Sequence, residues 1–415
     1  MIPLELEEVA ALAAGELSRA PGAERITGVQ VDSRRVEPGD LFIAVGRGVD
    51  FREDALSRGA AATLVPEEPF AAFAALGRAV RERTGARVVG ITGSTGKTST
   101  KDILAALCAP VAKTIAAEAS YNNEIGVPLT LCRLQPDTEV CILELAMRGL
   151  GQIAELCEIA RPEIGVVTNV GPAHLELVGS LEGVLRAKGE LIAALPPGGT
   201  AIVPEEFPVS RDDITVVRLG EPPVDIEDGR AVVGGVSFNF TARHQADNAA
   251  AALAALAALE LPRPARVDVD FSRWRGEEVP LPGDGLLIND AYNANPVSMR
   301  AALVYLADRA GERRRVAVLG DMAELGSGAS AFHREVGADA ARSGVQVLVA
   351  VGELARGYLD GAAGVAVMRW APDATAAVPI VDEILEPGDC VLVKASRALG
   401  LEVVGDALRA AAVRQ

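Results

Sequence analysis

The sequence lacks a secretory leader and any apolar run long enough to cross a membrane. Residues 1–8 have neither a basic start nor an apolar core, and no uninterrupted apolar run reaches the ~20 residues that a membrane span needs. The longest candidate, residues 249–261, is rich in alanine, and we interpret it as a soluble helix. The five cysteines form no C-x-x-C pair and lie in apolar segments. We therefore expect buried free thiols in a reducing compartment, the cytoplasm.

Basic residues are in deficit. Lys and Arg together number 40 against 57 Asp and Glu, which gives a net charge of −17. A charge of this sign repels phosphate backbones and argues against nucleic acid or an anionic membrane as a partner. Any anionic ligand must therefore be held by a local positive site. The sequence also has no repeat with a period of roughly 20–50 residues, which argues against a solenoid.

Apolar material is plentiful, at 49% of 415 residues, and suffices for several domains. From about residue 86, short apolar runs alternate with helical patterns, and a second such series begins near residue 286. This alternation is typical of βαβ units with a parallel sheet. The first 85 residues differ and include a predicted helix at 7–17, while Pro262 stops the helix that precedes it. We predict an α/β protein of three domains, at residues 1–85, 86–270 and 271–415.

A glycine-rich loop stands between a β-branched strand, residues 88–92, and a helical pattern. Its amides and the helix dipole can bind phosphate oxygens, Lys97 can neutralise the β- and γ-phosphates, and the Thr98 hydroxyl can bind Mg²⁺. The spacing G-x-x-G-K-T is shorter than the usual G-x-x-x-x-G-K-T, and the alternative is a glycine-rich turn without function. We predict an ATP-binding loop made of Gly93, Ser94, Thr95, Gly96, Lys97 and Thr98.

Two further strands end in groups that suit a metal ion. Glu144 ends the apolar run 140–144, and His174 follows the run 166–168. Open α/β sheets bind ligands at the carboxyl edge of their strands, and carboxylate oxygens suit a hard cation. The alternatives are a solvated glutamate and a structural histidine.

Together these segments resemble the Mur ligase family of peptidoglycan synthesis. The family's Thr-Gly-x-x-Gly-Lys-Thr loop is matched at residues 92–98 and its Asn-Asn-x-Ile-Gly-x-Pro motif at 122–128. Residues 289–299 match the Asp-x-Tyr-Asn-Ala-Asn-Pro-x-Ser-Met stretch of the members that add D-alanyl-D-alanine, which is the most discriminating match. The resemblance spans essentially the whole chain, with further matches at 144–146, 169–176, 187–190, 243–248, 272–277, 320–326 with His333, and 393–397 with Glu402.

The resemblance implies a role for each matched residue. Catalytic roles fall to Lys97, Lys188, His174 and Arg275, and Mg²⁺ ligands, at two sites, would be Thr98, Glu144, His174 and a carbamylated Lys188. The nucleotide would meet the glycine-rich loop, Asn248 at the adenine, Arg275 at the γ-phosphate, Asp290 at the ribose, and Tyr292 and Asn295 nearby. The other substrates would meet Ser33, Arg34, Asn122, Asn123, Lys394, Ser396 and Arg397. Helix caps, polar turns and surface ion pairs are the alternatives, and Trp274 stands where the family has glycine.

The resemblance also implies a reaction. ATP would activate the carboxylate of UDP-N-acetylmuramoyl-tripeptide as an acyl phosphate, which the amine of D-alanyl-D-alanine would then attack. The implied architecture is an N-terminal domain for the UDP-sugar, a central P-loop-type ATPase domain and a C-terminal Rossmann-like domain, in a monomer. Another Mur-type amide ligase, of the amino-acid-adding or folylpolyglutamate type, and a P-loop regulatory ATPase are the alternatives.

Overall fold

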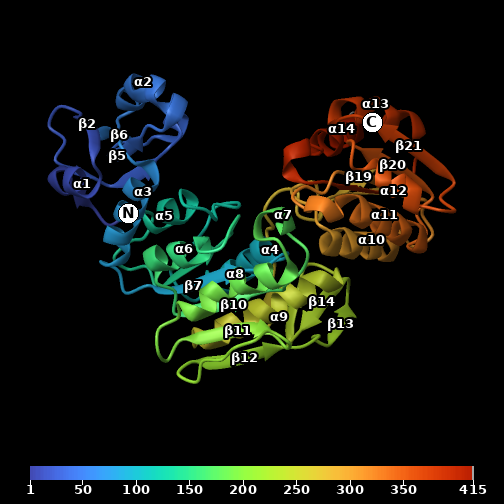
Figure 1. Cartoon of the computed structure of the whole chain (residues 1–415), viewed down its shortest axis with the longest axis horizontal. Helices are drawn as coiled ribbons and strands as arrows, with labels where there is room; N and C mark the ends of the chain where they lie inside the picture. The colour runs from blue at the N-terminus through green and yellow to red at the C-terminus, as the bar shows by residue number, and fades with distance from the viewer. Residues whose placement is uncertain (414–415) are drawn as a thin grey trace. The chain divides into compact units, whose positions relative to one another are not determined.

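The structure, a computed structural model, describes residues 1–413 and confirms the predicted α/β class (Figure 1). Its elements fall into two compact units, each of which is described by itself. The first unit comprises Met1–Thr168, Ala187–Asn239 and Asp247–Val269, and the second comprises Asn169–Arg186, Phe240–Ala246 and Asp270–Gln415. No helix within residues 1–413 is long and apolar enough to span a bilayer.

The start of the first unit is a four-stranded mixed sheet. Its strand order is β2 (Gly15–Arg19), β6 (Ala62–Pro66), β5 (Asp40–Ile43), β4 (Gly28–Gln30). A separate two-stranded sheet pairs β1 (Leu4–Glu5) with β3 (Arg25–Ile26). The helices of this region are α1 (Leu6–Leu12), α2 (Arg52–Ser57) and α3 (Pro69–Arg81), and its 3-10 turns are η1 (Ser33–Arg35) and η2 (Gly46–Phe51).

The predicted helix at residues 7–17 is wrong in its second half, because α1 ends at Leu12 and β2 begins at Gly15. Gly15 has a φ of +153°, and a Cβ there would lie 2.2 Å from the Val65 carbonyl oxygen. The glycine therefore allows β2 to pair closely with β6, and this pairing outweighs the helical pattern.

A six-stranded sheet, parallel throughout, forms the centre of the first unit. Adjacent parallel strands bring their carboxyl ends to one edge, and Ile91 of β7 pairs with Glu144 of β9 in the ladder. The strand order is β12 (Thr215–Leu219), β11 (Thr200–Pro204), β10 (Ile164–Val167), β7 (Arg87–Thr92), β9 (Val140–Glu144), β8 (Thr114–Ala116). The accompanying helices are α4 (Lys97–Cys108), α5 (Gly126–Leu131), α6 (Gln152–Ala160), α8 (Leu181–Ala193) and α9 (Arg243–Ala258).

A small sheet follows the central one in the chain. It contains a hairpin at Gly234 and Gly235, where β14 and β15 pair across these two glycines, which have φ values of +55° and +78°. The strands are β13 (Val224–Glu227), β14 (Arg230–Val233), β15 (Val236–Phe238) and β16 (Arg266–Val267).

The second unit contains a six-stranded sheet covered on both faces, which the near-continuous apolar runs of its strands require. Alternate residues of each strand face opposite cores: Leu348 packs with α10 and α11, and Val349 packs with α13 and α14. The strand order is β17 (Glu277–Leu281), β18 (Gly285–Asn289), β22 (Cys390–Lys394), β19 (Arg315–Gly320), β20 (Val347–Val351), β21 (Val367–Ala371), with β17 antiparallel and the rest parallel.

The other elements of the second unit are mostly helical. Its helices are α7 (Leu175–Val178), α10 (Pro296–Ala310), α11 (Ala329–Arg342), α12 (Arg356–Gly361), α13 (Ala374–Ile384) and α14 (Glu402–Val413), with the 3-10 turns η3 (Gly326–Gly328) and η4 (Arg397–Leu399).

Candidate functional site

The glycine-rich loop leaves the carboxyl end of β7 and leads directly into α4. Gly96 has a φ of +79°, and a Cβ there would lie 2.2 Å from the Asn248 side-chain oxygen. Gly93 is equally confined, with 1.8 Å to the Thr168 hydroxyl. The Lys97 amine folds back and donates to the Gly93 carbonyl at 2.8 Å. Both glycines are therefore required by the packing of this loop.

Thr168, just after β10, also supports this loop. Its hydroxyl donates to the Thr95 carbonyl at 2.5 Å and lies 3.3 Å from that of Thr92. Thr168 is not among the site residues predicted from sequence, although its place at the end of a strand next to β7 is a usable signal. Thr168 holds the backbone of the loop from the side of the neighbouring strand.

Thr98 and Glu144 meet where β9 ends beside the start of α4. The Thr98 hydroxyl donates to Glu144 Oε2 at 2.7 Å, and the Asn122 amide donates to Glu144 Oε1 at 2.8 Å. Thr98 and Glu144 are each only 1% exposed. A buried hydroxyl and carboxylate side by side at the edge of a parallel sheet form an oxygen set that suits Mg²⁺.

Asn123 has a different hydrogen-bond partner from Asn122. Its side-chain oxygen accepts from the Gly126 amide at 2.9 Å, at the start of α5, so this side chain supports a helix terminus. Of the two adjacent asparagines, Asn122 is the one directed at Glu144.

Lys101 lies one turn after Lys97 in α4. It is a buried lysine that is not among the site residues predicted from sequence. Its amine donates to the carbonyls of Ala117 at 2.8 Å and Ala119 at 3.0 Å, and it pairs with Asp102 at 2.8 Å. These bonds fix the segment that leads to Asn122 against the helix that begins at the glycine-rich loop.

Lys188 of α8 is 2% exposed. Burial lowers the pKa of its amine well below the ordinary value, and the positive charge of Lys97 lowers it further. Burial therefore favours the neutral form of this amine, which distinguishes Lys188 from a solvated helical lysine.

Asn248 lies inside α9, which begins five positions earlier at Arg243. Capping of this helix, the alternative considered from sequence, is therefore wrong for Asn248. The side chain instead faces the glycine-rich loop at Gly96 and lies 3.4 Å from the Thr100 hydroxyl.

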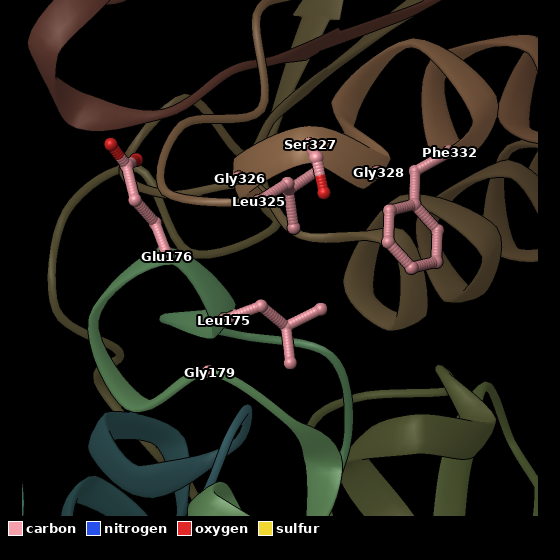
Figure 2. Close-up of a pocket in the computed structure, with 8 residues that line it drawn as sticks. All are labelled: Leu175, Glu176, Gly179, Leu325, Gly326, Ser327, Gly328 and Phe332. Atoms are coloured by element: carbon pink, nitrogen blue, oxygen red, sulfur yellow. The ribbon is translucent and has the colours of Figure 1, made fainter.

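His174 and Glu324 form a close pair in the second unit. His174 Nδ1 lies 2.5 Å from Glu324 Oε2, and the Glu176 amide donates to the Glu324 carbonyl at 3.3 Å. Beside this pair is a cavity of about 520 Å³, shown in Figure 2 between α7 and the η3 turn. Its lining consists of Leu175, Glu176, Gly179, Leu325, Gly326, Ser327, Gly328 and Phe332.

The loop after β18 is tied to the end of β22. The Lys394 amine, 2% exposed, pairs with Asp290 at 2.5 Å and donates to the Asn293 carbonyl at 2.9 Å. The Ser396 hydroxyl accepts from the Ala323 amide at 2.9 Å. Lys394 and Ser396 thus connect the loops that follow β18, β22 and β19 at the carboxyl edge of the sheet, and both residues are buried there.

Arg275 and Arg397 each stack on an aromatic ring. Arg275 Cζ lies 4.0 Å from the centre of the Tyr292 ring, and Arg397 Cζ lies 4.7 Å from that of Trp274. Arg397 also pairs with Glu402. Trp274 has a φ of +59°, a region that a glycine would occupy without strain.

Asn295 begins α10 with a reciprocal capping box. Its side-chain oxygen accepts from the Ser298 amide at 2.9 Å, and the Ser298 hydroxyl accepts from the Asn295 amide at 3.0 Å. The helix cap that the sequence left open as the alternative for this residue is therefore present, and its contact with the nucleotide stays a prediction.

The two N-terminal candidates differ in exposure. Ser33 is buried at 6%, whereas the Arg34 side chain is 82% exposed. Arg34 pairs with Asp32 at 2.7 Å and holds the pKa of that carboxyl at about 2. Arg34 is therefore preorganised on the surface.

The remaining histidines are structural. His333 Nε2 accepts from the Met322 amide at 3.0 Å and Nδ1 donates to the Ala329 carbonyl at 2.7 Å. Burial lowers the pKa of His244, whose ring is edge-on to Tyr305. Among the described residues no three His, Cys, Asp or Glu side chains form a metal-binding group. The donor set at Thr98 and Glu144 fits a hard cation that draws further oxygens from elsewhere.

Comparison with known proteins gives consistent matches. The family model of the Mur ligase middle domain matches residues 91–222, and that of the Mur ligase, glutamate ligase domain, matches residues 274–397. The UDP-N-acetylmuramoyl-tripeptide--D-alanyl-D-alanine ligase of Mycobacterium tuberculosis is 36% identical over 98% of both chains. The protein of the same name from Escherichia coli is 32% identical over 99% of both.

Solved structures agree with the sequence matches. A crystal structure of MurF from Acinetobacter baumannii has a TM-score of 0.83 at 26% identity, covering 98% of this chain and 99% of that one. MurF from Thermotoga maritima in complex with ADP has a TM-score of 0.76 at 26% identity, covering 93% and 98%. A folylpolyglutamate synthase/dihydrofolate synthase from Yersinia pestis, at 18% identity and a TM-score of 0.58, shares the fold alone. The chain belongs to the Mur ligase family.

Proposed function

We propose that this protein is an ATP-dependent, ADP-forming ligase that joins D-alanyl-D-alanine to UDP-N-acetylmuramoyl-tripeptide in peptidoglycan synthesis. The observation that carries the proposal is identity of 31–36% over 85–99% of this chain to relatives that bear this activity in their names. No residue of the site favours the amino-acid-adding or the folylpolyglutamate alternative over this activity.

The reaction has two steps. A carboxylate oxygen of the tripeptide attacks the γ-phosphorus of ATP, the bond to the ADP oxygen breaks, and an acyl phosphate forms. The amine of D-alanyl-D-alanine then attacks the acyl carbon, inorganic phosphate leaves, and the nitrogen loses a proton. The chain contributes positioning and electrostatic stabilisation, so no nucleophilic side chain is required.

The glycine-rich loop would hold the phosphates. Its backbone is confined by Asn248 and Thr168, which supports amides preorganised for phosphate oxygens. Lys97 supplies positive charge at the β- and γ-phosphates. When bound, Mg²⁺ at Thr98 and Glu144 would neutralise phosphate charge. His174, from the second unit, is the proposed imidazole ligand of a second Mg²⁺.

Lys188 is the proposed site of carbamylation. The neutral amine that burial favours attacks CO₂, a nitrogen–carbon bond forms, a proton leaves, and the side chain gains a carboxylate. That carboxylate supplies the oxygen ligands that the described donor set lacks.

The remaining site residues stay predictions. We propose that the adenosine meets Asn248, Asp290, Tyr292 and Asn295, and that Arg275 reaches the γ-phosphate. The peptide and UDP-sugar substrates would meet Ser33, Arg34, Asn122, Asn123, Lys394, Ser396 and Arg397. The boundaries at residues 85 and 270, a monomeric state and a cytoplasmic location belong to the same proposal.

One assay tests the function. The protein is incubated with ATP, Mg²⁺, UDP-N-acetylmuramoyl-tripeptide and D-alanyl-D-alanine, and phosphate and pentapeptide product are measured. We expect both, in equal amounts and only when all substrates are present. Phosphate release that does not depend on the dipeptide would instead support a regulatory ATPase, and product with a free amino acid would support another amide ligase.

A further inference from the structure

The contact between His174 and Glu324 joins two residues with uncommon backbone conformations. His174 has a φ of +58° and Glu324 a φ of +62°, both in the left-handed region that non-glycine residues rarely adopt. Such conformations persist only where the surroundings hold them, and they cluster at functional sites. Here the holding bonds run from the Leu177 and Val178 amides to the His174 carbonyl, at 3.0 and 3.1 Å, and from the Glu176 amide to the Glu324 carbonyl.

The geometry assigns the two ring nitrogens of His174 to different partners. Nδ1 lies 2.5 Å from a carboxylate oxygen of Glu324 and therefore carries the proton that it donates. Nε2 then keeps its lone pair and is available to a metal ion. Histidines that bind metals commonly donate their other nitrogen to a carboxylate, which fixes the tautomer and the ring orientation.

We infer that Glu324 is a positioning residue for metal binding, which holds His174 in the Nδ1-protonated tautomer with Nε2 directed to the ion. This inference rests on the metal role proposed for His174. The carboxylate comes from the loop after β19, in the region of the glutamate ligase domain, whereas His174 belongs to the matched middle domain. Glu324 thereby makes the metal site dependent on a loop of the neighbouring sequence domain.

The sequence provides convenient conditions for a direct test, because it has only three histidines. In protein labelled with ¹⁵N-histidine, the shifts of the ring nitrogens distinguish protonated from unprotonated positions. His333 is an internal reference with a protonated Nδ1, since that atom donates to Ala329. We expect the same pattern for His174 in the native protein and a shift toward the Nε2-protonated tautomer in Glu324→Ala. An unchanged tautomer in that variant would overturn the inference.

Metal affinity gives a second readout that does not require turnover. Mn²⁺ binding in the presence of ADP is measured by electron paramagnetic resonance for the native protein, Glu324→Ala, Glu324→Gln and His174→Ala. We expect Glu324→Ala to weaken binding by about 10–100-fold. Glu324→Gln, which keeps an acceptor oxygen at the same place, should weaken it less. The exposed Glu383 of α13 offers a matched control, and Glu383→Ala should leave binding unchanged.

Two results of the Mn²⁺ measurement would overturn the inference. If Glu324→Ala binds Mn²⁺ as tightly as the native protein or more tightly, Glu324 competes with the metal for His174 and the inference is wrong. If His174→Ala binds Mn²⁺ normally, the metal role of His174 fails and this inference fails with it. The ligase assay remains independent of both results. Retention of the His333 signals shows that a variant is folded. If Glu324→Ala does not fold, Glu324→Gln still tests the inference.

Discussion

Replacing Thr98 by valine removes one hydroxyl from a fully buried contact with a carboxylate. Thr98 donates to Glu144 Oε2 at 2.7 Å, and both residues are 1% exposed, so water cannot take the place of the lost donor. Hydrogen bonds to charged groups contribute about 1.5–3 kcal/mol. We therefore expect Thr98→Val to lower the free energy of unfolding of the first unit by about 1.5–3 kcal/mol, measured by urea titration without nucleotide, and to abolish ligation. Thr98→Ser should retain both.

The chain offers a matched control for this prediction. Thr130 is equally buried, but its hydroxyl donates to the Gly126 carbonyl within α5 at 2.8 Å, where the acceptor is a neutral helix carbonyl. Thr130→Val should therefore have a small effect, below about 1 kcal/mol. Equal losses of stability in Thr98→Val and Thr130→Val would refute the view that the buried carboxylate makes the Thr98 hydroxyl important.

Three further outcomes follow from the structure. Because burial lowers the pKa of Lys188 in the folded state, the unfolded chain binds more protons below the ordinary pKa of 10.5. Lys188→Met should thus be more stable than the native protein at pH 7 in CO₂-free buffer, by ~1.4 kcal/mol for each unit of lowering, and this gain should shrink as the pH approaches 10.5; a constant gain would contradict it. Gly96→Ala should lose ATP binding in calorimetry, since its Cβ meets Asn248 and the backbone strain adds about 1–2 kcal/mol. Arg34→Ala should raise the pKa of Asp32 from about 2 toward 3.8 in a carboxyl NMR titration, and no rise would show that the pair is absent in solution.

Much of the fold could be predicted because parallel strands buried on both faces are continuous apolar runs. The apolar run placed from sequence at 140–144 has the bounds of β9, and the strand placed at 88–92 differs from β7 by one residue. The start of the chain was harder, because residues 7–17 carry a helical pattern while tertiary pairing with β6 decides the conformation after Leu12. A pattern within one segment contains no information about its pairing partner.

The contacts of the candidate site also fall into those that the sequence could predict and those that it could not. Glu144 beside Thr98 could be expected, since parallel strands and their following helices meet at one edge of a sheet. The partners of Lys101 and Thr168 could not be predicted, because packing and not a local sequence pattern brings Ala117 and Thr95 to them. Lys188 was predicted through the family resemblance alone, and its burial in the structure is what distinguishes it from a solvated lysine.

The burial of all five cysteines makes the native chain a suitable background for site-specific labelling. The thiolate is the form that reacts with maleimides, and burial raises the pKa of these thiols far above neutral pH. A thiol introduced by Glu53→Cys in α2 and another by Glu383→Cys in α13, both at exposed positions, should therefore take up a pair of fluorophores selectively. Energy transfer between them would follow changes in the distance between the N- and C-terminal parts as each substrate is added. The thiols that should stay unlabelled are Cys108, Cys132, Cys141 and Cys157, with pKa values of about 12, and Cys390, at about 11.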